Sequence, residues 1–169
     1  MMPIGPLPPG CVALCAPQAV DASSDISAAG ACEVATGCIA ISNVTITGCT
    51  VDGVHYQRVT TRAMGLTITY TVHFTFTGTS DGFTFQGRGT CSDSVFVVQV
   101  LTPTHGATLL TPPDCAANLR CTAQDAGFDP ERSVQSFIVR LSGSVTCVAC
   151  GGEYTIVKAC PPLDDCQPH

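Results

Sequence analysis

The chain has 169 residues, a formal net charge of −6 and only 12% charged residues. Proteins that bind nucleic acid or an anionic membrane carry basic surfaces, so this composition argues against both kinds of partner. No apolar run approaches the roughly 20 residues that a membrane-spanning helix requires. The length suits one domain with flanking tails.

Twelve cysteines indicate either metal binding in a reducing compartment or disulfides in an oxidising one. The first ten residues, MMPIGPLPPG, lack the basic and apolar regions of a secretory signal, although the chain begins with Met. We therefore expect a protein that is made in a reducing compartment and oxidised later, outside the cell. The candidate disulfide cysteines are Cys11, Cys15, Cys32, Cys38, Cys49, Cys91, Cys115, Cys121, Cys147, Cys150, Cys160 and Cys166.

Residues 1–17 are rich in proline and glycine and carry Cys11 and Cys15. Proline lacks an amide donor and holds the backbone near polyproline II, so this segment is predicted to be an extended connector arm that does not pair inside a sheet. Residues 18–37 are small and polar without a clear period, which predicts a linker or a short helix.

Residues 38–160 are predicted to form the folded domain, because apolar and polar residues alternate along much of this region. From Leu66 to Thr77 every even position is apolar and every odd position is polar, which is typical of a strand with one buried face. Asp81-Gly82 tolerates positive φ and favours a tight turn, so residues 66–91 are predicted to form a β-hairpin.

Further strands are predicted at 39–47, 54–61, 95–101, 137–148 and 154–159, the last two forming a second hairpin around Gly151-Gly152. Residues 102–132 contain four prolines and are predicted to form a long loop region, and residues 161–169 an irregular C-terminal tail. This arrangement predicts an all-β fold, an antiparallel β-sandwich or jelly roll with an extended N-terminal arm.

The cysteine motifs that could form a redox or metal site match the known patterns poorly. Cys147-Val148-Ala149-Cys150 follows a strand instead of opening a helix, unlike a redox motif. With Cys160 and Cys166 it could form a four-cysteine zinc site, but the second pair is spaced too widely. The alternative is that these four cysteines form disulfides within the terminal hairpin or with neighbouring subunits.

The remaining polar residues do not assemble a catalytic site. The four histidines, His55, His73, His105 and His169, are scattered, and His73 is expected to face solvent from its strand. The acidic segment 125–131 lacks the order of a calcium loop, so its aspartates are predicted to stabilise turns. We therefore expect a protein that is not an enzyme and that uses no metal or cofactor.

Cys11 and Cys15 have no core of their own to bury them, so their partners must lie elsewhere on the domain or on another subunit. An arm of about 15 extended residues reaches roughly 45 Å, enough to span a neighbouring small domain. We take Cys11 and Cys15 as the candidates for interchain disulfides, which would make dissociation a covalent event.

The cysteines of the arm, the threonine-rich strands and the missing signal peptide resemble the subunits of bacterial endospore appendages (Ena-like), which pair a cysteine-bearing connector with a jelly-roll body. The segments Asn43–Thr47, Gly89–Asp93 and Phe128–Pro130 resemble SPOCS-type spore coat proteins. This chain has Cys-x-x-x-Cys on the arm where the appendage pattern has adjacent cysteines, and a longer body.

The resemblance implies a structural subunit of a self-assembling, disulfide-cross-linked extracellular fibre or surface layer of endospores. Its partners would be copies of itself in a helical or linear polymer and other spore-surface proteins, with no nucleic acid and no membrane. Strands of adjacent subunits would pair edge to edge. The alternative is a monomeric secreted adhesion or binding module whose disulfides are all internal.

Overall fold

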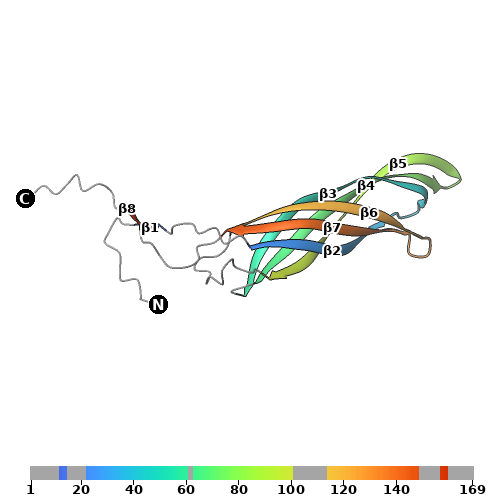
Figure 1. The fold of residues 1–169 in the computed structure, drawn as a ribbon. Helices are drawn as coiled ribbons and strands as arrows, with labels where there is room; N and C mark the ends of the chain where they lie inside the picture. The colour runs from blue at the N-terminus through green and yellow to red at the C-terminus, as the bar shows by residue number, and fades with distance from the viewer. Residues whose placement is uncertain (1–11, 15–21, 61–62, 101–113, 149–156, 160–169) are drawn as a thin grey trace, which may run out of the picture.

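The computed structural model describes residues 12–14, 22–60, 63–100, 114–148 and 157–159, and they form an all-β protein (Figure 1). Two antiparallel three-stranded sheets pack against each other as a β-sandwich, which confirms the predicted fold class. One sheet has the order β2 (Ala22–Ala35), β7 (Val134–Val148), β6 (Asp114–Asp129), and the other has β3 (Ala40–Thr60), β4 (Ala63–Ser80), β5 (Phe83–Val100).

The sandwich is elongated and its two ends differ. At one end, which we call the base, the first residue of β2, Ala22, is paired with Cys147 near the end of β7. At the other end, the tip, β2 turns into β3 and the β4–β5 and β6–β7 hairpins reverse direction (Figure 1). Both flanking segments of the chain therefore leave the sandwich from the base.

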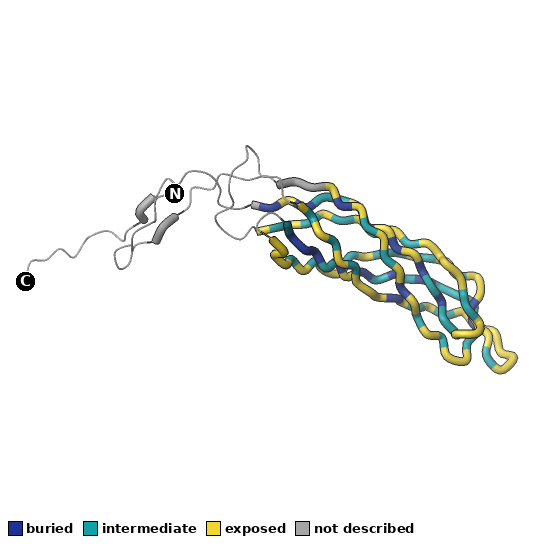
Figure 2. The backbone as a smooth tube through the Cα atoms, turned by 90° about the horizontal axis from the view of Figure 1, so that it is seen from below, coloured by how far each residue is buried: buried dark blue, intermediate teal, exposed yellow. Residues whose placement is uncertain are grey.

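The two central strands, β4 and β7, supply most of the core, because each has a neighbour on both sides and a sheet across from it. The predicted alternation of β4 is confirmed: its even positions from Met64 to Phe74 are buried. In β7 the odd positions point inward, and Phe137 and Val139 are fully buried. The buried residues run along the length of both sheets, and the tip is mostly exposed (Figure 2).

Aromatic rings fill the space that several glycines leave open on the inner faces of the sheets. In β4 and β5 each ring lies on the glycine directly opposite it across the two strands, where an added Cβ atom would collide with ring atoms. These three cross-strand pairs are Phe74 on Gly89, Phe76 on Gly87, and Phe85 on Gly78. Such pairs fix the register of the two strands, because a slipped register would drive each ring into a side chain.

Tyr70 makes a similar contact between the sheets. Its ring fills the space beside Gly30 of β2, and its hydroxyl donates a 3.0 Å hydrogen bond to the carbonyl of Ala31. The side chain of Tyr70 is fully buried, so its polar end requires this acceptor.

The predictions of irregular structure for two regions are wrong. The linker or helix expected at 18–37 contains the 14-residue strand β2, and the loop expected at 102–132 contains β6. Adjacent predicted strands also merge, since 39–47 and 54–61 belong to β3, and the hairpin predicted at 66–91 extends from Ala63 to Val100. The turn of this hairpin is confirmed at Asp81-Gly82, where both residues have positive φ.

The predicted pairing of the last two strands is also wrong. The described part of the predicted 154–159 strand, β8 (Val157–Ala159), pairs with β1 (Val12–Leu14), whereas β7 pairs with β2 and β6. The arm predicted at 1–17 thus includes a short stretch that does pair in a sheet; these three residues contain no proline. Residues 149–156 and 160–169, with Gly151-Gly152 and the predicted tail, lie outside the described residues.

The contact between Tyr70 and Gly30 gives a testable prediction. Gly30→Ala places a methyl group against the ring of a buried tyrosine, so we expect the free energy of unfolding to fall by about 1 to 3 kcal/mol. Gly53→Ala is the control, because nothing lies near its Cβ position, and it should change stability by less than about 0.5 kcal/mol. Denaturant unfolding measures both; equal effects would contradict the packing.

Candidate functional site: the disulfides and the free thiol at the tip

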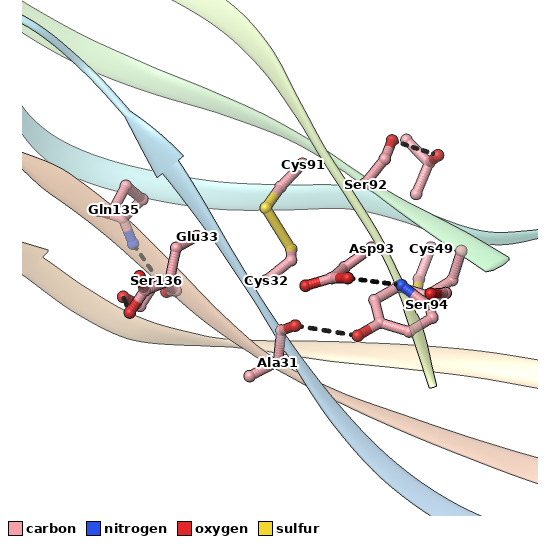
Figure 3. The surroundings of a disulfide bond; sticks show 12 residues. Ala31, Cys32, Glu33, Cys49, Cys91, Ser92, Asp93, Ser94, Gln135 and Ser136 are labelled. Atoms are coloured by element: carbon pink, nitrogen blue, oxygen red, sulfur yellow. Dashed lines mark hydrogen bonds between the residues drawn. A yellow bond between two sulfur atoms is a disulfide. The ribbon is translucent and has the colours of Figure 1, made fainter. Parts of the chain in front are cut away.

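Two disulfides join the sheets at the two opposite sides of the sandwich. Cys32 of β2 is bonded to Cys91 of β5, and Cys49 of β3 is bonded to Cys121 of β6, with Cα–Cα distances of 6.0 and 5.3 Å. All four strands are sheet edges. Figure 3 shows the first of these bonds passing from β2 to β5 beside the hydrogen bond to Ala31. Each side of the sandwich is therefore closed by a covalent bond.

The two inter-sheet bonds start from one row of residues in the β3–β4–β5 sheet. Cys49 and Cys91 lie on either side of Val72 of β4 and are both paired with it. In the other sheet their partners are paired with different residues of β7, Cys32 with Phe137 and Cys121 with Leu141. This offset is expected because strands of packed sheets cross at an angle, so a row across one sheet runs diagonally over the other.

The third disulfide lies within one sheet. Cys115 of β6 and Cys147 of β7 are directly opposite each other and are bonded. Because its sulfur is already bonded, Cys147 cannot also form a redox disulfide with Cys150 or bind zinc in the four-cysteine site that the sequence left open. Among the described residues no group of His, Cys, Asp or Glu has the arrangement of a metal site. Cys150, Cys160 and Cys166 lie outside the described residues.

Cys38 is the one cysteine without a partner in the part of the chain that the structure describes, and it is exposed. It lies at the tip, in the turn from β2 to β3, which Thr36 holds in place. The amide of Thr36 donates to the carbonyl of Ser133 at 2.9 Å, and its hydroxyl lies 2.9 Å from the carbonyl of Ile39. The thiol is thus presented to solvent on a braced turn, next to the β6–β7 turn.

The two arm cysteines that were predicted to form interchain bonds, Cys11 and Cys15, lie outside the described residues. Sequence reasoning included Cys38 among the general disulfide candidates but did not single it out. No local pattern distinguishes it from its neighbours Cys32 and Cys49, and only the pairing in three dimensions separates them.

The acidic segment 125–131 stabilises turns, as predicted. Asp125 Oδ1 accepts from the amide of Gly127 at 2.8 Å, and Asp129 Oδ1 accepts from the amide of Glu131 at 2.9 Å. Asp125 also accepts from Nε2 of the fully buried Gln135 at 2.6 Å. These bonds hold the β6–β7 end of the tip in a defined conformation.

A shallow hollow of about 810 Å³ lies on the outer face of the β3–β4–β5 sheet. His73 lines it beside Arg88, and threonine hydroxyls surround both. His73 is half-buried there, on the polar face of β4 as predicted, and His55 is exposed. His105 and His169 lie outside the described residues.

No helix in the described ranges is long and apolar enough to cross a membrane. The three disulfides indicate an oxidising, extracellular environment. Comparison of the chain with protein-family models, curated proteins and solved structures gives no match.

Removal of an inter-sheet disulfide should weaken the fold strongly. The Cys49–Cys121 bond spans 72 residues, so restriction of the unfolded chain predicts that Cys49→Ala/Cys121→Ala lowers the free energy of unfolding by about 4 kcal/mol. Cys115→Ala/Cys147→Ala is the control, because its bond spans 32 residues within one sheet and should cost less. Denaturant midpoints test this, and a larger loss in the control would contradict it.

Tyr70 gives a prediction for alkaline pH. Burial raises the pKa of its hydroxyl above the usual value of 10.0, and the nearby charge of Asp93 raises it further. The folded protein holds this proton more tightly than the unfolded chain does. The resulting stability is fully present below pH 10 and is lost as the pH rises through the folded pKa. Burial also raises the pKa of Tyr56, so absorbance at alkaline pH should show late-titrating tyrosines whose amplitude falls, without vanishing, in Tyr70→Phe; an unchanged titration would contradict the assignment.

Proposed function

We propose that this protein is a non-enzymatic structural subunit of a self-assembling, disulfide-cross-linked extracellular fibre or surface layer. The observation that carries the proposal is the position of Cys38. This exposed and unpaired thiol lies at the tip. The two flanking segments, which hold the undescribed cysteines, are connected to the sandwich at its base.

The number of cysteines supports a bond from Cys38 to a cysteine of a flanking segment. Six of the twelve form the three disulfides described above, and Cys38 is unpaired. The five that remain are Cys11, Cys15, Cys150, Cys160 and Cys166, an odd number that cannot pair completely among themselves. One bond from Cys38 to one of these five leaves four, so that every cysteine can be paired, and the proposal places this bond between two chains.

The length of the sandwich limits a bond within one chain. Strand β2 has 14 residues and spans about 43 Å from base to tip. Eleven residues separate Cys11 from Ala22 at the base, and fully extended they span at most about 40 Å. Cys15 is closer to Ala22 along the chain and reaches less far. With the roughly 6 Å that a disulfide spans between Cα atoms, Cys11 could reach Cys38 of its own molecule only with its arm fully extended along the sandwich, and Cys15 falls short of it.

A bond from tip to arm joins two different surfaces, so each subunit can bind a predecessor and a successor. Such a heterologous contact produces a filament when the rotation between subunits does not close a ring. The sandwich suits this use, because disulfides close both of its sides and hold its ends at a fixed separation.

Strand pairing between neighbouring subunits is supported on one side of the sandwich. The edge strands β2 and β5 keep an unbroken register with β7 and β4, and neither contains proline or lysine. Strand β3, on the other side, shifts register at four points. Bulges of this kind discourage pairing with another chain, so lateral contacts are expected at the β2 and β5 side.

The surface of a bacterial endospore is the proposed location. The chain resembles endospore appendage subunits in its arm cysteines and threonine-rich strands, and release from the producing cell by lysis would expose it to an oxidising environment. The low content of lysine and arginine also leaves few cleavage sites for basic-specific proteases.

Deletion of residues 1–16 tests this function. The full chain, oxidised after purification, should form polymers that enter a denaturing gel only after reduction, whereas the deletion variant should stay folded and monomeric because it lacks Cys11 and Cys15. Circular dichroism checks that the variant retains its strands. Reductant-sensitive polymers of the deletion variant would contradict the role of the arm, and a full chain that runs as a monomer would contradict the proposed function.

The hollow around His73 and Arg88 favours a second candidate, a monomeric adhesion or binding module whose polar face takes an anionic or hydroxyl-rich ligand. The same gel separates the candidates, because the module predicts a full chain that migrates as a monomer without reductant.

A further inference from the structure

A row of aromatic rings leads from the core of the sandwich to the tip. Phe137 contacts Phe74 with ring centroids 4.7 Å apart, Phe74 contacts Phe76 at 5.8 Å, and Phe76 contacts Phe85 at 6.2 Å. Exposure rises along the row, from 0% at Phe137 and 3% at Phe74 to 40% at Phe85. Phe83, two residues further along β5 on the same face, is 77% exposed.

The exposed end of this row lacks a covering sheet. Nearer the base, β7 covers the inner face of the β4–β5 hairpin. At the tip, the hairpin extends past the β6–β7 turn, so the same face continues there without a sheet opposite it (Figure 1). The three rings at the end of the row, Phe76, Phe85 and Phe83, form what we call the tip platform. Phe76 and Phe85 lie on glycines of the opposite strand, Phe76 is partly buried against the core, and Phe85 is 40% exposed.

We propose that the tip platform binds the proline-rich segment 1–10 of a second copy of this chain. The inference rests on the proposed function and identifies the surface through which one subunit receives the arm of the next. Segment 1–10 contains four prolines and three large apolar residues besides Met1, and no charged side chain. Proline-rich segments in polyproline II conformation bind to aromatic surfaces because they are preorganised and need few backbone hydrogen bonds.

The dimensions and charges of the two surfaces agree. Phe76, Phe85 and Phe83 occupy three successive levels of the hairpin, which span about 14 Å. Four or five residues of polyproline II cover that length at about 3.1 Å per residue. The one charged residue from 75 to 85 is Asp81, next to the platform, and segment 1–10 has no acidic side chain that it would repel.

The platform also explains which thiols meet. Cys38 belongs to the same tip, since Ala40 two residues later is paired with Thr79 of the hairpin. Cys11 follows the bound segment directly in sequence. The two thiols would form one S–S bond and lose two protons and two electrons, which a low-molecular-mass disulfide accepts as it is reduced to two thiols. The internal disulfides of the sandwich require an oxidant of the same class.

A complementation experiment tests the pairing of Cys11 with Cys38. The full-length variants Cys11→Ser and Cys38→Ser should each remain monomeric after oxidation. An equimolar mixture should give a reductant-sensitive dimer, because one variant supplies Cys38 and the other supplies Cys11. Dimers or polymers of Cys11→Ser alone, or a mixture that stays monomeric, would overturn this pairing.

A peptide experiment tests the platform apart from the covalent bond. The synthetic peptide MMPIGPLPPG, which lacks cysteine, is titrated into full-length Cys38→Ser. Amide signals of the β4–β5 hairpin should shift with a Kd below about 1 mM. Adding Phe83→Ser should abolish the shifts. Adding Phe96→Ser should leave them unchanged, since Phe96 is 54% exposed on β5 outside the platform.

The outcomes separate the two proposals. Shifts that are absent, or that survive Phe83→Ser, overturn the platform even where the full chain forms disulfide-linked polymers. Polymers in that case would still support the proposed function, with the arm bound at another surface. A full chain that stays monomeric, while the peptide binds at the hairpin, would retain the platform as a binding surface and overturn the covalent assembly.

Discussion

The arrangement of this protein depends on two disulfides that join the edges of its sheets. The bonds Cys32–Cys91 and Cys49–Cys121 lie on opposite sides of the sandwich and start from the same row of β4, at Val72. Without them, the two sheets would be held together by side-chain packing and by inter-sheet hydrogen bonds such as that from Tyr70 to Ala31. Because these bonds use four of the twelve cysteines within one chain, the cysteines that are left to bond elsewhere can be identified.

The two ends of the sandwich have different chemistry, and the proposed assembly follows from this difference. The base gives rise to both flanking segments, which hold all five undescribed cysteines. The tip carries a free thiol on a braced turn beside exposed phenylalanines. Because strands of this length keep the ends about as far apart as a fully extended arm reaches, the arm thiols meet the tip thiol most easily in another molecule. A rigid body thus acts as a spacer between two reactive ends.

Much of the fold could be predicted from the sequence where side chains are large. The alternation from Leu66 to Thr77 and the Asp81-Gly82 turn were sufficient for the central hairpin. Strands β2 and β6 were missed because their inward positions are mostly small, such as Ala28 in β2 and Ala117 in β6, so the alternation has little contrast. The partner strand supplies the bulk there, as Tyr70 does beside Gly30. The free state of Cys38 could not be predicted, because it follows from which cysteines meet across the sheets.

The most direct test of this account is the disulfide map of single chains. Oxidised protein is alkylated, digested with pepsin at low pH, where thiol exchange is slow, and its cross-linked peptides are identified by mass spectrometry. Isotope-labelled and unlabelled chains mixed before oxidation distinguish bonds within a chain from bonds between chains. The account predicts Cys32–Cys91, Cys49–Cys121 and Cys115–Cys147 within chains, and Cys38 only in peptides of mixed isotope composition. A bond from Cys38 to a cysteine of its own chain would contradict it.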